Sequence, residues 1–127
     1  MIKLKSLLVE RIDYHDTAEY LVKHYNLRSK VKFGKVRGQN KADYDWIKDV
    51  INLRKSYPSV KEFLLSVLHE VHHALQRKKM GVKKYEKAYQ LAGDLAVNKG
   101  KDFHDDNPYE ESAEKWAKRE LSKWVKK

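Results

Sequence analysis

The chain has 127 residues and no Cys, with 28 Lys or Arg, 18 Asp or Glu and six His, so its formal net charge is +10. This length suffices for one domain with a real core and would be cramped as two, so we expect one domain over residues 1–127. Without Cys the sequence excludes disulfides, thiolate catalysis and Cys-containing zinc sites, so any metal must be held by His and carboxylates.

The N-terminal segment contains only a short apolar stretch, interrupted by Glu10, Arg11 and Asp13, and it does not match a secretory signal peptide. No apolar run approaches the ~20 residues that span a bilayer. We therefore expect a cytoplasmic, monomeric protein that does not bind membranes. The positive net charge favours an acidic partner, and nucleic acid is one candidate.

The N-terminal half shows weak secondary-structure signals. Residues 2–10 fit either a strand or a short helix. Three further elements are predicted before residue 55: a helix from Asp16 or Thr17 to about Asn26, a short strand through Val31, Phe33 and Val36, and one interrupted strand or hairpin arm over residues 43–54.

The C-terminal half shows stronger, helical patterns. Ser59 and Glu62 form a capping box, and the apolar residues that follow have the spacing of a helix that ends before Gly81. A second helix is predicted over residues 82–98, and a third from Asn107-Pro108 to the C-terminus. The expected inward residues of the second helix are Tyr85, Ala88, Tyr89, Ala92, Leu95 and Ala96. The predicted fold class is α+β, with a small sheet and a helix followed by three helices.

The first of these three helices carries the motif H-E-x-x-H, in which His69 and His73 are four residues apart. Residues i and i+4 lie on the same face of a helix, so both imidazoles can reach one metal ion. Glu70 lies about 100° further round the helix, beside the ion, where it can take a proton from the attacking water. His72, three residues after His69, is expected to support the site or to pack within the helix.

A catalytic zinc needs a third protein ligand, and the downstream candidates are His104, Glu110, Glu111 and Glu114. Glu110 and Glu114 share a helix face, where two like charges repel unless a cation lies near them. Glu111 precedes Lys115 by four residues and can form an ordinary surface ion pair.

Each of the two carboxylates on the shared face also has a structural interpretation. With Asn107 as the N-cap, Glu110 would occupy the third helical position and could cap the helix. Glu114 could pair with Lys118. We favour Glu110 as the third ligand, with Glu111 and His104 as the remaining alternatives.

His69-Glu70-Val71-His72-His73, followed by Glu110-Glu111-Ser112-Ala113-Glu114, resembles the motif pair of the gluzincin metallopeptidases. The resemblance covers residues 60–120 and extends to small metallopeptidase-like proteins of bacteriophages. It implies a minimal zincin fold that binds one zinc ion and hydrolyses peptide bonds in a peptide or protein substrate. Glu110 would be the third zinc ligand, Glu114 would hydrogen-bond His69, and Ala113 would be the small residue between them.

The zincin resemblance also implies an edge strand that pairs with an extended substrate above the motif helix. Residues 43–54 are the candidate for that edge, although Tyr44 and Trp46 fit a core role at least as well. His104 could stabilise the oxyanion, although a loop-capping role fits it better. An aromatic hydroxyl could act on the tetrahedral intermediate; the candidates are Tyr85, Tyr89 and Tyr109, of which the first two are expected to pack in the core.

Two alternatives remain open at this point. SprT-like proteases, which act on DNA-bound proteins, combine H-E-x-x-H with a third histidine, which here would be His104. The other alternative is a non-catalytic module in which zinc stabilises a nucleic-acid-binding or protein-binding surface.

Overall fold

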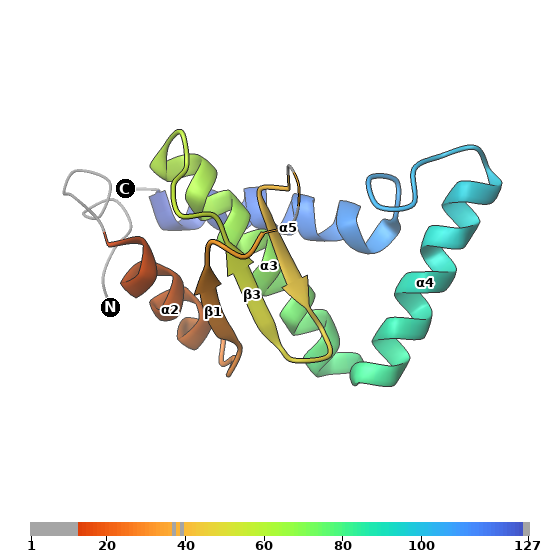
Figure 1. Ribbon diagram of the computed structural model, residues 1–127, viewed down its shortest axis with the longest axis horizontal. Helices are drawn as coiled ribbons and strands as arrows, with labels where there is room; N and C mark the ends of the chain where they lie inside the picture. The colour runs from red at the N-terminus through yellow and green to blue at the C-terminus, as the bar shows by residue number, and fades with distance from the viewer. Residues whose placement is uncertain (1–12, 37, 39, 126–127) are drawn as a thin grey trace.

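The computed structural model describes residues 13–36, 38 and 40–125, and the predicted element at residues 2–10 lies outside this part of the chain. The described residues form a three-stranded sheet and four helices, which confirms the predicted α+β class, and Figure 1 shows their arrangement. In chain order the elements are α2 Tyr14–His24, β1 Lys30–Phe33, β2 Ala42–Asp45, β3 Val50–Leu53, α3 Val60–Met80, α4 Val82–Asn98 and α5 Pro108–Val125.

The sheet has the strand order β1-β3-β2, with β1 parallel and β2 antiparallel to β3. Residues 43–54, predicted as one interrupted strand or a hairpin arm, contain parts of both arms of a hairpin, and β2 forms one edge of the sheet. Asp49, with a φ of 58°, lies in the turn before β3 and accepts hydrogen bonds of 2.6 Å from Ser29 Oγ and from Tyr44 Oη. Strand β1 ends at Phe33, so Val36 was wrongly predicted to continue it.

Helix α2 begins earlier than the sequence indicated. Its N-cap is Asp13, whose side chain accepts a hydrogen bond of 3.1 Å from the backbone N–H of Asp16, so the predicted start at Asp16 or Thr17 was wrong. Tyr14, in the first turn, stacks on Phe63 of α3 with ring centroids 4.1 Å apart. A tertiary contact thus supports a first turn that local periodicity does not reveal.

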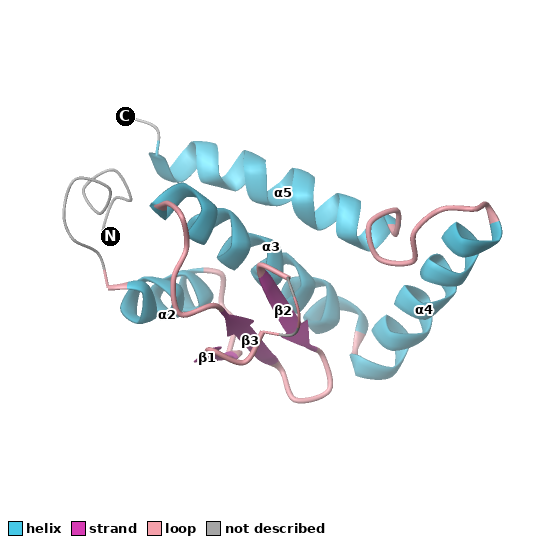
Figure 2. Cartoon of the chain, turned by 45° about the horizontal axis from the view of Figure 1, so that its top comes forward, coloured by secondary structure: helices cyan, strands magenta, loops and turns pink. Residues whose placement is uncertain are grey.

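Helix α3 is the centre of the fold. Its N-cap Ser59 accepts a hydrogen bond of 3.2 Å from the backbone N–H of Glu62, as the capping box predicts. Figure 2 shows α3 between the sheet and α5. Its buried residues therefore make up much of the core; they are Phe63, Leu64, Ser66, Val67, Leu68, Glu70, Val71, His73 and Ala74.

Helix α4 stands apart from this core, as both views show (Figures 1 and 2). Its buried residues are Tyr85, Tyr89, Gly93 and Ala96, whereas Leu95, predicted to face inward, is 51% exposed. The prediction for Leu95 was wrong because α4 packs through one narrow face. On that face Gly93 lies against the ring of Phe103, where a side chain would not fit.

Candidate metal centre

Two histidines one turn apart on α3 meet at their Nε2 atoms. The Nε2 atoms of His69 and His73 are 3.2 Å apart, and His73 is almost completely buried. The rise of one helical turn places both rings on the face that looks toward α5 and the cavity. The spacing argument for the H-E-x-x-H motif is therefore confirmed as far as the positions of the two rings are concerned.

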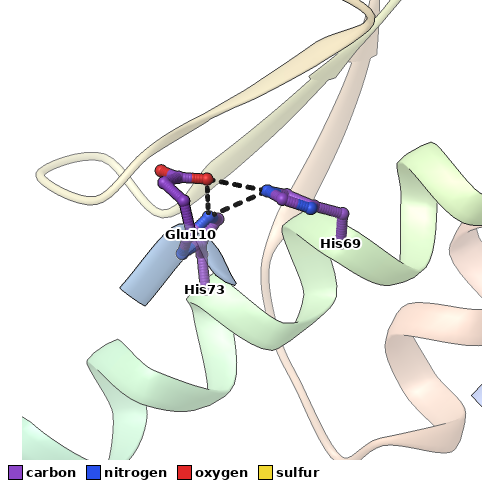
Figure 3. Close-up of side chains that lie close together, drawn as sticks. All are labelled: His69, His73 and Glu110. Carbon is purple, nitrogen blue, oxygen red and sulfur yellow. Dashed lines mark hydrogen bonds and ion pairs between the residues drawn. The ribbon is translucent and has the colours of Figure 1, made fainter. Parts of the chain in front are cut away.

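The third group is the carboxylate of Glu110, in the first turn of α5. Its Oε1 lies 2.8 Å from His69 Nε2 and 2.9 Å from His73 Nε2, as Figure 3 shows. The candidate ligand atoms of these three residues all lie within 4.8 Å of one another. Of the four downstream candidates, Glu110 is the one that contacts the Nε2 atoms of both histidines.

The position of Glu110 depends on Asn107, which is completely buried just before α5. Asn107 Nδ2 donates to the carbonyl oxygen of Tyr89 at 3.1 Å, and its Oδ1 accepts from the backbone N–H of Tyr109 at 2.9 Å. The N–H of Asn107 donates to the carbonyl oxygen of His104, so Glu110 does not cap it. Asn107 therefore ties the start of α5 to α4 and leaves the Glu110 carboxylate for the histidines.

Each histidine is held by a further side chain at its Nδ1 atom. His69 Nδ1 lies 3.1 Å from Glu114 Oε2, so Glu114 is placed as the gluzincin resemblance implied. Glu114 also forms an ion pair of 3.9 Å with Lys118. The pairing with Lys118 and the contact with His69 therefore occur together. Such partners set the tautomer and orientation of an imidazole, leaving Nε2 to bind a metal.

The partners of His73 were not predicted. His73 Nδ1 lies 3.0 Å from Gln76 Oε1 and 2.9 Å from the hydroxyl of Tyr85, and this hydroxyl donates to Gln76 Oε1 at 3.1 Å. Gln76 follows His73 by three residues on the same helix face, a spacing that could have drawn attention to it. Tyr85 is buried as expected, but its hydroxyl supports the site.

The second oxygen of Glu110 faces two other groups. The hydroxyl of Tyr89 donates to Glu110 Oε2, and His104 Nε2 lies 3.2 Å from the same atom. Tyr89 is buried as expected, but its hydroxyl also contacts the site. The side chain of His104 is 59% exposed and lies outside the three-residue cluster. A SprT-like site would need His104 inside the cluster as the third ligand.

The charges of the cluster are strongly coupled. Burial raises the pKa of Glu110, but hydrogen bonds from His104, His69 and His73 outweigh it and hold this pKa far below its usual range. The same carboxylate is the main cause that raises the pKa of His104 to about 9. Glu110 is thus held as an anion, which is the form that binds a metal ion.

Glu70 is buried and lines a cavity of about 480 Å³ together with His69, His73 and Glu110. Burial raises its pKa, while the neighbouring histidines lower it less strongly. A carboxylate with a raised pKa beside a reacting group is suited to accept and return a proton. Its position beside the cluster agrees with the role predicted from the helix geometry.

Two further candidate residues, His72 and Glu111, also lie outside the three-residue cluster. His72 packs its ring against Trp116 at 5.0 Å and places Nε2 3.2 Å from Ser112 Oγ, so it contributes to the packing of α3 on α5. Burial lowers the pKa of His72 to about 4. Glu111 is exposed on α5 and does not belong to the cluster.

The chain matches no protein-family model, no curated protein and no solved structure. In the part of the chain that the structure describes, no helix combines the length and apolar character that crossing a membrane requires.

Proposed function

We propose that the protein is a zinc metallopeptidase whose metal ligands are His69, His73 and Glu110. The ligand geometry carries this proposal. Zinc bonds to nitrogen and oxygen of about 2.0–2.2 Å place tetrahedral ligand atoms about 3.3–3.6 Å apart. The observed separations of 2.8, 2.9 and 3.2 Å are somewhat shorter, so the three side chains would move apart slightly to hold one small ion.

The donor set and its surroundings fit a catalytic site better than a structural one. Three protein ligands would leave a fourth position for water, and His69, His73 and Glu110 border a cavity from which water could reach the ion. A bound zinc ion would polarise the scissile carbonyl and lower the pKa of water at this position. Two imidazoles, each held at Nδ1 by a further side chain, and one anionic carboxylate are the ligand types that zinc accepts.

Glu70 supplies the proton transfers of the proposed reaction. Its carboxylate accepts a proton from the attacking water while the oxygen of that water bonds to the carbonyl carbon. The carbon–nitrogen bond then breaks, and Glu70 returns the proton to the leaving amine. Tyr89 and His104, which contact the other oxygen of Glu110 and line the cavity, are candidates to stabilise the developing oxyanion.

Strand β2 is suited to hold an extended substrate over the site. It pairs with β3 on one side, and Ala42, Asp43 and Tyr44 line the same cavity as the histidines. A peptide that adds to the other side of β2 would lie between this strand and α3, with its backbone crossing the cluster. This arrangement supports the assignment of residues 43–54 to substrate binding.

Two measurements test the proposal. Elemental analysis of protein purified without chelator or metal-binding tag should find about one zinc per chain. The same measurement on the His69→Ala/His73→Ala double variant should find no bound zinc. A peptide-library digest read by mass spectrometry should show cleavage by the wild type and none by Glu70→Gln, which should still bind zinc. Equal cleavage by both proteins would exclude the proposed mechanism.

A further inference from the structure

The cavity is closed at one end by contacts between the β2–β3 hairpin and α4. Trp46, directly after β2, packs its ring against Tyr85 and Tyr89, with centroid distances of 5.9 and 5.5 Å. Its Nε1 donates to Glu86 Oε2 at 2.9 Å, and its carbonyl oxygen accepts from Arg77 Nε at 2.6 Å. In Figure 1 this turn lies beside the corner where α3 meets α4.

The opposite end of the cavity is open. It is lined by Lys41 and Glu62, whose side chains are 70% and 37% exposed and form an ion pair of 2.9 Å. Lys118 of α5, 67% exposed, lines the cavity as well. Flexible, solvated side chains of this kind leave room for a chain to enter, whereas the packed aromatic rings at the other end do not.

The metal ligands lie closer to the closed end. Two rings of the wall contact the ligands directly, since the Tyr85 hydroxyl lies 2.9 Å from His73 Nδ1 and the Tyr89 hydroxyl donates to Glu110. At the open end, by contrast, Glu62 precedes His69 by almost two helical turns. An extended peptide advances about 3.3 Å per residue, so only one or two residues fit between the reacting bond and the aromatic wall. Several residues fit on the open side.

We propose, on the basis of the proposed function, that the protein is an aminopeptidase that removes one or two residues from the N-terminus of a peptide. The direction of β2 indicates which terminus faces the wall, because the strand runs from Ala42 near the open end to Asp45 beside Trp46. Antiparallel pairing is the more stable arrangement. A peptide antiparallel to β2 therefore places its N-terminus at the wall.

The chemistry of the wall suits an α-ammonium group. Trp46, Tyr85 and Tyr89 line the cavity with aromatic rings, which attract a cation to their faces. The Glu86 carboxylate accepts a hydrogen bond from the Trp46 indole but does not itself line the cavity. The positive charge of Arg77 already has partners, because its guanidinium donates to the Trp46 carbonyl oxygen and lies 3.7 Å from the Asp49 carboxylate. His104, also on the cavity, is paired with Glu110 and Asp105.

The test compares three forms of one peptide of about ten residues: unmodified, N-acetylated and C-amidated, each incubated with zinc-loaded wild type and followed by mass spectrometry. We expect release of one or two N-terminal residues from the unmodified and amidated forms, and acetylation should slow cleavage about tenfold or more. Trp46→Ala should open the wall and cleave the acetylated form internally. Ile47→Ala, an exposed neighbour outside the cavity, is the matched control.

A binding measurement gives a second readout that does not depend on turnover. Zinc-loaded Glu70→Gln should bind the unmodified peptide about tenfold more tightly than the acetylated one in isothermal titration calorimetry. Three results would each overturn the aminopeptidase assignment: equal affinities for the two peptides, undiminished internal cleavage of the acetylated peptide by the wild type, or release of residues from the C-terminus. Cleavage in any of these patterns would still be consistent with a peptidase. Absence of any cleavage beyond that of Glu70→Gln would instead overturn the proposed function itself.

Discussion

His69 is held between two carboxylates of α5 that lie one turn apart: its Nε2 is 2.8 Å from Glu110 Oε1, and its Nδ1 is 3.1 Å from Glu114 Oε2. The two acids thus contact opposite sides of one imidazole. Glu110 is buried and also contacts His73, whereas Glu114 is half exposed. The same helix face therefore supplies one group that can bind a metal and one that orients its ligand.

This difference predicts distinct effects of removing each acid. Glu110→Ala should cut zinc affinity severely, because it removes a ligand and its negative charge. Glu114→Ala should lower affinity or activity about 10- to 100-fold, since it removes only the partner of His69. Glu111→Ala should resemble the wild type. Competitive zinc titration measures all three, with circular dichroism as the check on folding. Loss of zinc in Glu111→Ala but not in Glu110→Ala would contradict the site.

The Tyr85 hydroxyl should support zinc binding through His73. Tyr85→Phe keeps the buried ring but removes the hydroxyl that lies 2.9 Å from His73 Nδ1. We expect a drop in zinc affinity of about tenfold, at the lower end of such effects because Gln76 remains as a partner. The same titration measures it, with Tyr20→Phe on α2 as a control that should not change affinity. An unchanged affinity in Tyr85→Phe would limit Tyr85 to packing.

Gly93 should be intolerant of a side chain because of Phe103. A Cβ at this position would lie far inside van der Waals contact with Phe103 Cε2. Gly93→Ala should therefore destabilise the protein by about 1–3 kcal/mol, as overpacking does. Thermal unfolding measures the change, and Gln90→Ala on the exposed side of α4 is the control. Adding Phe103→Ala should remove the clash, so the double variant should not show the sum of the two single effects.

Glu120 should make stability depend on pH. It accepts a hydrogen bond of 2.7 Å from Tyr25 Oη and pairs with Lys123 at 2.8 Å. Burial raises its pKa, but these two partners outweigh it and lower the pKa below its usual value. A depressed pKa in the folded state stabilises the protein above the unfolded value near 4.3, and this stabilisation is lost as the pH falls through the folded pKa.

The variant Glu120→Gln tests this dependence. It should lower the free energy of unfolding by about 1–2 kcal/mol at pH 7, because a charged hydrogen-bond acceptor is replaced by a neutral one. Below about pH 4 the difference from the wild type should shrink as Glu120 becomes protonated. Chemical denaturation at pH 7 and pH 3 measures both values. A difference that is constant with pH would show that the charge of Glu120 does not contribute.

Much of the C-terminal half could be predicted because its signals are local. The Ser59–Glu62 capping box and the apolar spacing after it define α3 from Val60 to Met80, as observed. The four-residue spacing of His69 and His73 determines that their rings share a face, since both belong to one rigid helix. Backbone hydrogen bonds within that helix decide these features whatever the rest of the chain does.

Other features were decided only by contacts between distant segments. Glu110 is 41 residues from His69, and the rotation of α5 that brings it there depends on buried Asn107 and the backbone of α4. The early start of α2, the hydroxyl of Tyr85 on His73 and the closure of the cavity at Trp46 are of the same kind. Local periodicity shows which face of a helix is apolar, but the partner that covers this face is set by packing in three dimensions. The sequence therefore determined the two histidines and Glu70, and tertiary structure decided which acid completes the cluster and where the cavity ends.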